Sequence, residues 1–190
     1  MTTSALLVMD VQNGIVARVP DAADRLLERI GVAVDGARSH GIPVVYVRVA
    51  FRPGGEDVSP ANKSFAALAG RGGMGVDDPE TQVHPAVAPG PDDVVVVKKR
   101  VSAFTGSDLE VVLRSLGASR LVLGGISTSG VVLSTLRQAA DLDYGITVLR
   151  DGCADSDPEV HRVLLDKVFP RQADVMTTGE WVAGLGSVNS

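Results

Sequence analysis

The stretch LVLGGISTSGVVLST, from Leu121 to Thr135, carries the clearest fold signal in the chain. Its first three residues form an apolar run typical of a buried strand, and two glycines follow. Small hydroxylated residues come next, and a helical pattern continues to Leu142. The stretch predicts a strand, a tight turn and a helix N-terminus, where unpaired N–H groups can meet a ligand. The alternative is a structural turn in which Ser127 or Ser129 caps the helix.

Similar apolar runs alternate with helical patterns on both sides of this stretch. We expect strands at 5–9, 43–49, 93–97, 121–123, 146–149 and 173–176. We expect helices at 21–39, 63–69, 107–116, 158–168 and 178–185, besides the one that ends near Leu142. This alternation predicts an α/β fold: a three-layer, Rossmann-like, six-stranded and mostly parallel sheet with helices on both faces. We expect residues 1–190 to form a single domain.

Composition limits the function classes. Hydrophobic residues make up 45% of the 190 residues and charged residues 22%, an ordinary globular balance. The net charge of −5 disfavours nucleic acid and anionic membranes as partners. The single cysteine, Cys153, excludes an internal disulfide and a cysteine-cluster metal site. The N-terminus shows no signal-peptide pattern and no apolar run approaches the roughly 20 residues of a membrane helix, so we expect a cytoplasmic protein.

Polar residues follow three of the predicted strands. Asp10 follows the first strand, Lys98 the third, and the glycine turn the fourth. Carboxyl ends of parallel strands share one edge of a sheet, so we expect these groups to converge there. A carboxylate beside an ammonium can serve as an acid–base pair, and turn N–H groups can hold an oxyanion. The structural alternative for Asp10 is a role in shaping its turn.

The segment from Phe51 to Asp92 has a different composition, with seven glycines and six prolines. It predicts long loops with one short helix, an arrangement often found in a lid or a pocket wall. Arg52 and Arg71 could meet an anionic ligand there, although such arginines are more often solvated surface. His84 is expected to be structural.

Three motifs together resemble the isochorismatase-like hydrolases: LVMDVQ around Asp10, Lys98 ahead of SAFTGSDL, and the turn GISTSG. The resemblance spans Leu6 to about Met176 and implies a six-stranded parallel sheet. In most members of that family a cysteine thiol attacks a carbonyl, an aspartate takes its proton and a lysine stabilises the charges. The resemblance thus implies that Asp10 and Lys98 are catalytic.

The resemblance also implies the surroundings of the catalytic pair. A cis peptide bond would join Ile126 to Ser127, and the N–H groups of Ser127 and Val131 would form an oxyanion hole. The substrate pocket implied by the resemblance has four further members: Gln12, Arg52, Phe104 and Gly130.

The chain departs from the family at the nucleophile. Val131 occupies the position of the catalytic cysteine, with Thr135 four residues later as in the family. A valine cannot form a covalent intermediate. Cys153 follows the fifth strand instead of the fourth, so we expect it to be a packing residue. Isochorismatases proper also lack the cysteine; they cleave a vinyl ether, for which Asp10 could serve as general acid.

Two hypotheses follow. The chain is either a hydrolase for a small amide, ester or vinyl ether that uses Asp10 and Lys98 without a thiol, or an inactive small-molecule-binding relative. No cofactor is expected. No metal is expected either, because the residues after the second strand, Phe51 to Gly54, lack the histidines of the nicotinamidases. A homodimer or higher homo-oligomer is expected from the family and from the many apolar residues between Val131 and Leu142.

Overall fold

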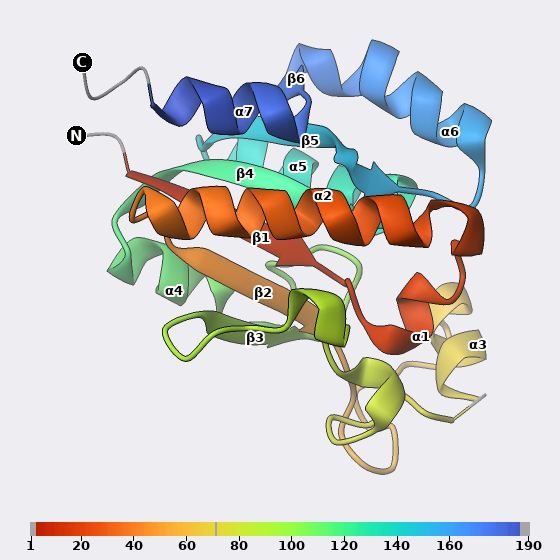
Figure 1. Ribbon diagram of the computed structural model, residues 1–190. Coiled ribbons are helices and arrows are strands. Elements are labelled where there is room, and N and C mark those ends of the chain that lie inside the picture. The colour runs from red at the N-terminus through yellow and green to blue at the C-terminus, as the bar shows by residue number, and fades with distance from the viewer. Residues whose placement is uncertain (1–2, 71, 187–190) are drawn as a thin grey trace.

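The computed structural model describes residues 3–70 and 72–186, and within them the chain builds one six-stranded sheet (Figure 1). The strand order is β3-β2-β1-β4-β5-β6, and every neighbouring pair is parallel. The strands are β1 (Thr3–Met9), β2 (Val44–Val49), β3 (Val94–Lys98), β4 (Ala118–Ile126), β5 (Gly145–Ala154) and β6 (Asp174–Met176). The predicted α/β fold is confirmed.

Helices cover both faces of the sheet. α2 (Pro20–Ser39) and α7 (Thr178–Leu185) lie on the near face in Figure 1. They pack against alternate strand residues such as Leu6 and Val8. The opposite face packs its own core against α4 (Leu109–Ser115), α5 (Leu133–Asp141) and the segment that begins with α6 (Pro158–Val163). Leu7 and Met9 point to that second core, so β1 is buried on both sides, as its continuous apolar run predicts.

β5 is longer than predicted because it bulges and then pairs again with β4. Leu123 pairs with Val148 and Gly125 with Cys153, which is two steps along β4 but five along β5. The polar residues inside the bulge hid this continuation from a pattern search. The bulge places Cys153 within the strand, where it is buried.

The long segment between β2 and β3 folds over the carboxyl edge of the sheet. It contains α3 (Lys63–Ala69) and two short 3₁₀ turns, η1 (Pro79–Thr81) and η2 (Pro85–Val87). Phe51 and Phe65 pack edge to face with ring centroids 5.5 Å apart. His84 is structural, as expected: its ring nitrogen Nδ1 accepts the Ala86 N–H at the start of η2. Arg71 lies outside the described residues.

The apolar residues of the fourth helical segment are used largely within the chain. Val131, Val132, Leu136 and Ala139 are buried in the core of that face, and only Leu142 at its end is exposed. The apolar residues of this helix therefore do not by themselves indicate an interface with a second subunit. The homo-oligomer stays a prediction. Within the described residues, no helix is long and apolar enough to cross a membrane.

Candidate active site

Asp10 and Lys98 form a buried ion pair at the carboxyl edge of the sheet. Oδ2 of Asp10 lies 2.8 Å from Nζ of Lys98, and the two side chains are 8% and 2% exposed. β2 separates the strands that carry them, so their backbones stand about 10 Å apart at the usual strand spacing. The long lysine side chain covers that distance across the end of β2. The convergence expected from the strand tips is therefore present.

The backbone fixes the direction of the Asp10 carboxylate. Asp10 lies one residue beyond β1 with a φ of 56°, in the left-handed region that aspartate tolerates better than most residues. Its N–H donates to the carbonyl of Val47 at 2.8 Å, which ties this turn to β2.

The carboxyl group of Asp10 retains one oxygen for chemistry. Oδ1 is buried and has no hydrogen-bond partner among the described residues. Burial raises the pKa of the Asp10 carboxyl above its ordinary value, and the nearby Lys98 ammonium opposes this rise only in part. A carboxyl group with a raised pKa and a free oxygen is suited to hold a proton and to release it to a bound molecule.

All three ammonium hydrogens of Lys98 are engaged. Besides Asp10, Nζ donates to the carbonyl of Arg100 at 3.0 Å and to that of Val101 at 2.9 Å. An ammonium has three donors and no acceptor, so this set is complete. Lys98 therefore orients Asp10 and supplies positive charge, whereas Oδ1 of Asp10 is the atom left for another partner.

A cavity of about 330 Å³ lies over the pair, and we call it the Asp10 cavity. Its polar lining residues are Asp10, Arg18, Ser64, Lys98, Ser127 and Ser156. Its apolar lining residues include Ile15, Val49, Phe65, Leu68, Ile126 and Val131. The walls are thus mostly apolar with a few polar groups, the usual character of a small-molecule site. The short α3 supplies part of the wall, the role expected of its loop segment.

The glycine turn after β4 forms one side of this cavity. The peptide bond between Ile126 and Ser127 is cis. The helix that follows opens with a π-helical turn, η3 (Thr128–Val132), and continues as α5. Gly130 lies so close to Ser127 that an added Cβ would come within 2.6 Å of the Ser127 hydroxyl oxygen.

The capping interpretation of the two serines is wrong. The Ser127 side chain makes no capping hydrogen bond at this helix start. Ser129 contributes its backbone instead: its N–H donates to the Asp155 carboxylate at 2.7 Å. Asp155 follows β5, so the acceptor for the Ser129 N–H comes from the end of a neighbouring strand. The local sequence around Ser129 could not indicate this partner.

Thr135 ties the helix to the loop after β3. It is fully buried, and its hydroxyl accepts the N–H of Ala103 at 3.0 Å. The same loop supplies the two carbonyls that hold Lys98, so Thr135 braces the Lys98 side of the site.

No thiol lies in the Asp10 cavity. Val131 is buried in its wall and belongs at the same time to the core. Cys153 lines a different cavity, beside α6, and burial raises the pKa of its thiol to about 12. A thiol with such a pKa is almost wholly protonated at neutral pH and is a poor nucleophile.

Gln12 does not enter the Asp10 cavity as predicted. Its amide nitrogen donates to the carbonyls of Val49 and Thr81, and its amide oxygen accepts the N–H of Val49. These bonds use the amide to join the end of β1 to β2 and to η1. Gln12 therefore links these elements and is not among the residues that line the Asp10 cavity.

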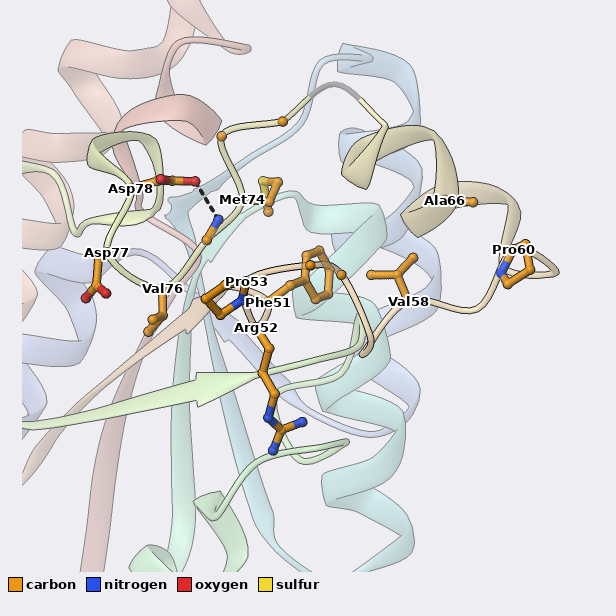
Figure 2. Close-up of a pocket in the computed structure, with 15 residues that line it drawn as sticks. Phe51, Arg52, Pro53, Val58, Pro60, Ala66, Met74, Val76, Asp77 and Asp78 are labelled. Atoms are coloured by element: carbon orange, nitrogen blue, oxygen red, sulfur yellow. Dashed lines mark hydrogen bonds between the residues drawn. The ribbon is translucent and has the colours of Figure 1, made fainter.

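Arg52 and Phe104 also lie elsewhere. Arg52 lines a cavity of about 600 Å³ between Phe51 and Asp78, which we call the loop cavity (Figure 2). Its guanidinium extends away from the other labelled side chains in Figure 2 and pairs with Asp57. Phe104 is buried in the core against Tyr144, with ring centroids 6.2 Å apart. Of the four predicted pocket members, only Gly130 lines the Asp10 cavity.

Arg18 is the third ionisable residue of the Asp10 cavity, and no pattern in the sequence indicates it. It follows the four-residue helix α1 (Asn13–Val16), which is too short to give a periodic signal. Within the described ranges, no group of three or more His, Cys, Asp or Glu side chains could hold a metal ion. The absence of a cofactor or metal stays an expectation.

Comparison with known proteins gives matches that cover most of the chain. The Isochorismatase domain model matches residues 4–180. An isochorismatase family protein of Escherichia coli O157:H7 is 34% identical over 94% of this chain and 94% of its own length. A ureidoacrylate amidohydrolase of Methylobacterium radiotolerans is 31% identical over 99% of this chain and 79% of its own. The structure of an isochorismatase family protein from Burkholderia thailandensis superposes with a TM-score of 0.86 at 31% identity, covering 97% of this chain and 96% of the other.

Proposed function

Since the chain belongs to the isochorismatase family, we propose that it is a hydrolase of a small molecule that works without a covalent enzyme intermediate. The buried Asp10 carboxyl, with Oδ1 free and Oδ2 held by Lys98, is the observation that carries this proposal. A buried ion pair is costly to maintain for stability alone, so a chemical use for it is the better account.

In the proposed reaction, Asp10 acts as both general acid and general base. With a vinyl ether, protonated Asp10 gives its proton to the enol carbon, water adds to the resulting oxocarbenium carbon and returns a proton to Asp10, and the hemiketal breaks its C–O bond to release a ketone and an alcohol. With an ester or amide, the Asp10 carboxylate takes a proton from the attacking water, and protonated Asp10 then gives it to the leaving oxygen or nitrogen as the C–O or C–N bond of the tetrahedral intermediate breaks. Lys98 keeps the carboxylate in place and offsets its negative charge.

The cavity walls serve this reaction in two ways. The N–H groups of Ser127 and Val131 are the proposed donors for a developing oxyanion, as the family resemblance implies. The Val131 side chain fills the place of the thiol and leaves attack to water. The ureidoacrylate amidohydrolase among the relatives supports an amide as one substrate class to test.

The test is a metabolite screen by ligand-induced thermal stabilisation, followed by turnover assays on each compound that binds. The raised pKa of Asp10 fixes the expected pH dependence. For a vinyl ether the protonated form is the acid, so kcat should fall as pH rises through a pKa above the usual aspartate value of about 4; for an ester or amide the carboxylate is the base, so kcat should instead fall as pH drops through that pKa. A rate that is flat from pH 4 to 9 would contradict Asp10 as the acid.

The second candidate is an inactive relative that binds a small molecule, and Val131 at the nucleophile position is the observation in its favour. The same screen separates the two functions. Compounds that stabilise the protein without being turned over at any pH would support binding alone.

A further inference from the structure

The Asp10 cavity has an uncompensated positive charge. Its only ionisable lining residues are Asp10, Lys98 and Arg18; the charges of the first two cancel when Asp10 is ionised, and the cavity is more positive still when Asp10 is protonated. The Arg18 side chain has no ion pair or hydrogen bond to the described part of the chain. A cavity with a charge of about +1 in a chain of net charge −5 favours an anion over a neutral or cationic ligand.

Arg18 lies at the outer end of the cavity. It is exposed, whereas Asp10 and Lys98 are buried. The Arg18 N–H donates to the carbonyl of Ile15 at 3.0 Å, and Ile15 and Val19 line the cavity too, so the turn between α1 and α2 forms this wall. Arg18 also borders a smaller cavity that contains Glu80, but no ion pair joins Arg18 to Glu80.

Apolar side chains line the space between the two charged ends. Ile15, Phe65 and Leu68 form one apolar patch, contributed by α1 and α3, and Val131 faces the cavity from η3. A volume of about 330 Å³ corresponds to about eleven waters at about 30 Å³ each. A ligand that fills it has about ten non-hydrogen atoms.

We propose that the Asp10 cavity is specific for a small organic monocarboxylate, whose carboxylate binds Arg18 at the mouth while its apolar body places the reacting group at Asp10. The claim that the substrate reacts at Asp10 rests on the proposed function. The claim that the substrate carries a carboxylate rests on Arg18 alone. The planar guanidinium can give a carboxylate two parallel N–H···O bonds, which a neutral amide of the same shape cannot match.

The experiment compares acids with their own amides as inert probes. Benzoate and benzamide, phenylacetate and phenylacetamide, and sorbate and sorbamide are titrated into the wild type by calorimetry and thermal shift. Arg18→Gln is the test variant. Arg25→Gln is its matched control, because Arg25 is another exposed arginine, on α2, that lines a different cavity.

We expect at least one acid to bind the wild type about tenfold or more tightly than its amide. Arg18→Gln should remove this preference without weakening the amide, and Arg25→Gln should keep it. Leu68→Trp, which fills the cavity, should weaken acid and amide together and so locate the binding.

If none of the three acids binds more tightly than its amide, or if Arg18→Gln keeps the preference, the inference is overturned. Either result leaves the proposed hydrolase intact, because turnover tests Asp10 separately. Conversely, an Arg18-dependent preference in a protein that turns over no compound of the screen would support carboxylate recognition by Arg18 and would favour the inactive, small-molecule-binding relative over the proposed hydrolase.

Discussion

The two cavities at the carboxyl edge differ in how they are built. The loop cavity is the larger, at about 600 Å³ against about 330 Å³, and its walls come from the single stretch between Phe51 and Asp78. The walls of the Asp10 cavity come from the ends of β1 to β4, from α1, α3 and η3, and from the turn before α2. Only the Asp10 cavity contains a buried ion pair, since the Arg52 side chain of the other is 71% exposed. Burial of charge, and not volume, thus distinguishes the cavity that we propose as the active site.

The comparison is tested most strongly by removing one carboxylate from each cavity. Asp10→Asn keeps the shape but removes the proton-transfer group, so kcat should fall by roughly 10²–10⁴. Asp77→Asn changes an exposed aspartate of the loop cavity and should leave kcat unchanged. Steady-state kinetics on any substrate from the screen measures both variants, with circular dichroism to check the fold. If Asp77→Asn lowered kcat as much as Asp10→Asn does, the loop cavity would be a better candidate for the active site.

Removing one cation from each cavity compares their stabilities. Lys98→Met leaves Asp10 buried without its counter-charge, and the free energy of unfolding should drop by about 3–5 kcal/mol at pH 7. Arg52→Met should lower the free energy of unfolding by about 1 kcal/mol or less. Asp57, which loses the guanidinium, still accepts the backbone N–H of residue 52 and still lies 3.8 Å from the Lys99 ammonium. Urea denaturation gives both values. Equal losses would mean that the Asp10–Lys98 pair is no more critical than a surface pair.

The positions of residues in these two cavities were predictable from the sequence only where the backbone is regular. Asp10 and Lys98 could be placed together because parallel strands end at one edge, whatever the loops do. Arg52 could not be placed, because the glycines after it take positive φ angles, 94° at Gly54 and 75° at Gly55, and turn the chain away from the strand direction. Gln12 was misplaced because its partners come from β2 and η1, far along the chain.

The fold was predictable for a similar reason. Each strand has an apolar run of its own, whereas the extension of β5 to Ala154 depends on pairing with β4 beyond the bulge. Long-range pairing of this kind leaves no local pattern. The Ser129–Asp155 hydrogen bond was likewise invisible, since it joins the ends of two strands.

A smaller effect is expected when the nucleophile position regains a thiol. Val131→Cys places a cysteine at a helix start in the same cavity as Lys98, where its pKa should fall. Iodoacetamide at pH 7 should label this variant at least about tenfold faster than the wild type, whose only thiol, Cys153, has a pKa of about 12. Mass spectrometry follows the rate. Equal labelling of variant and wild type would show that this helix start does not activate a thiol.

The smallest expected effect is that of alkylating the wild-type protein, which should not change its activity. Treatment of the wild type with iodoacetamide should leave turnover unchanged, because Cys153 is buried outside the Asp10 cavity. Residual activity after treatment is the measurement, with Cys153→Ser as the control. Loss of activity in both would identify Cys153 as the nucleophile and would overturn the assignment to Asp10.

The close approach of β4 to β1 limits how this cavity could be redesigned for other substrates. At Gly125, with a φ of 146°, any Cβ would lie 2.0 Å from the carbonyl oxygen of Met9, so a mutant library should hold this position constant. Gly130 is restricted more weakly, because the atom that an added Cβ would meet is the Ser127 hydroxyl, which can rotate away. Positions 130 and 127 should therefore be randomised as a pair, whereas Leu68 and Arg18, which also line the cavity, can be varied one at a time.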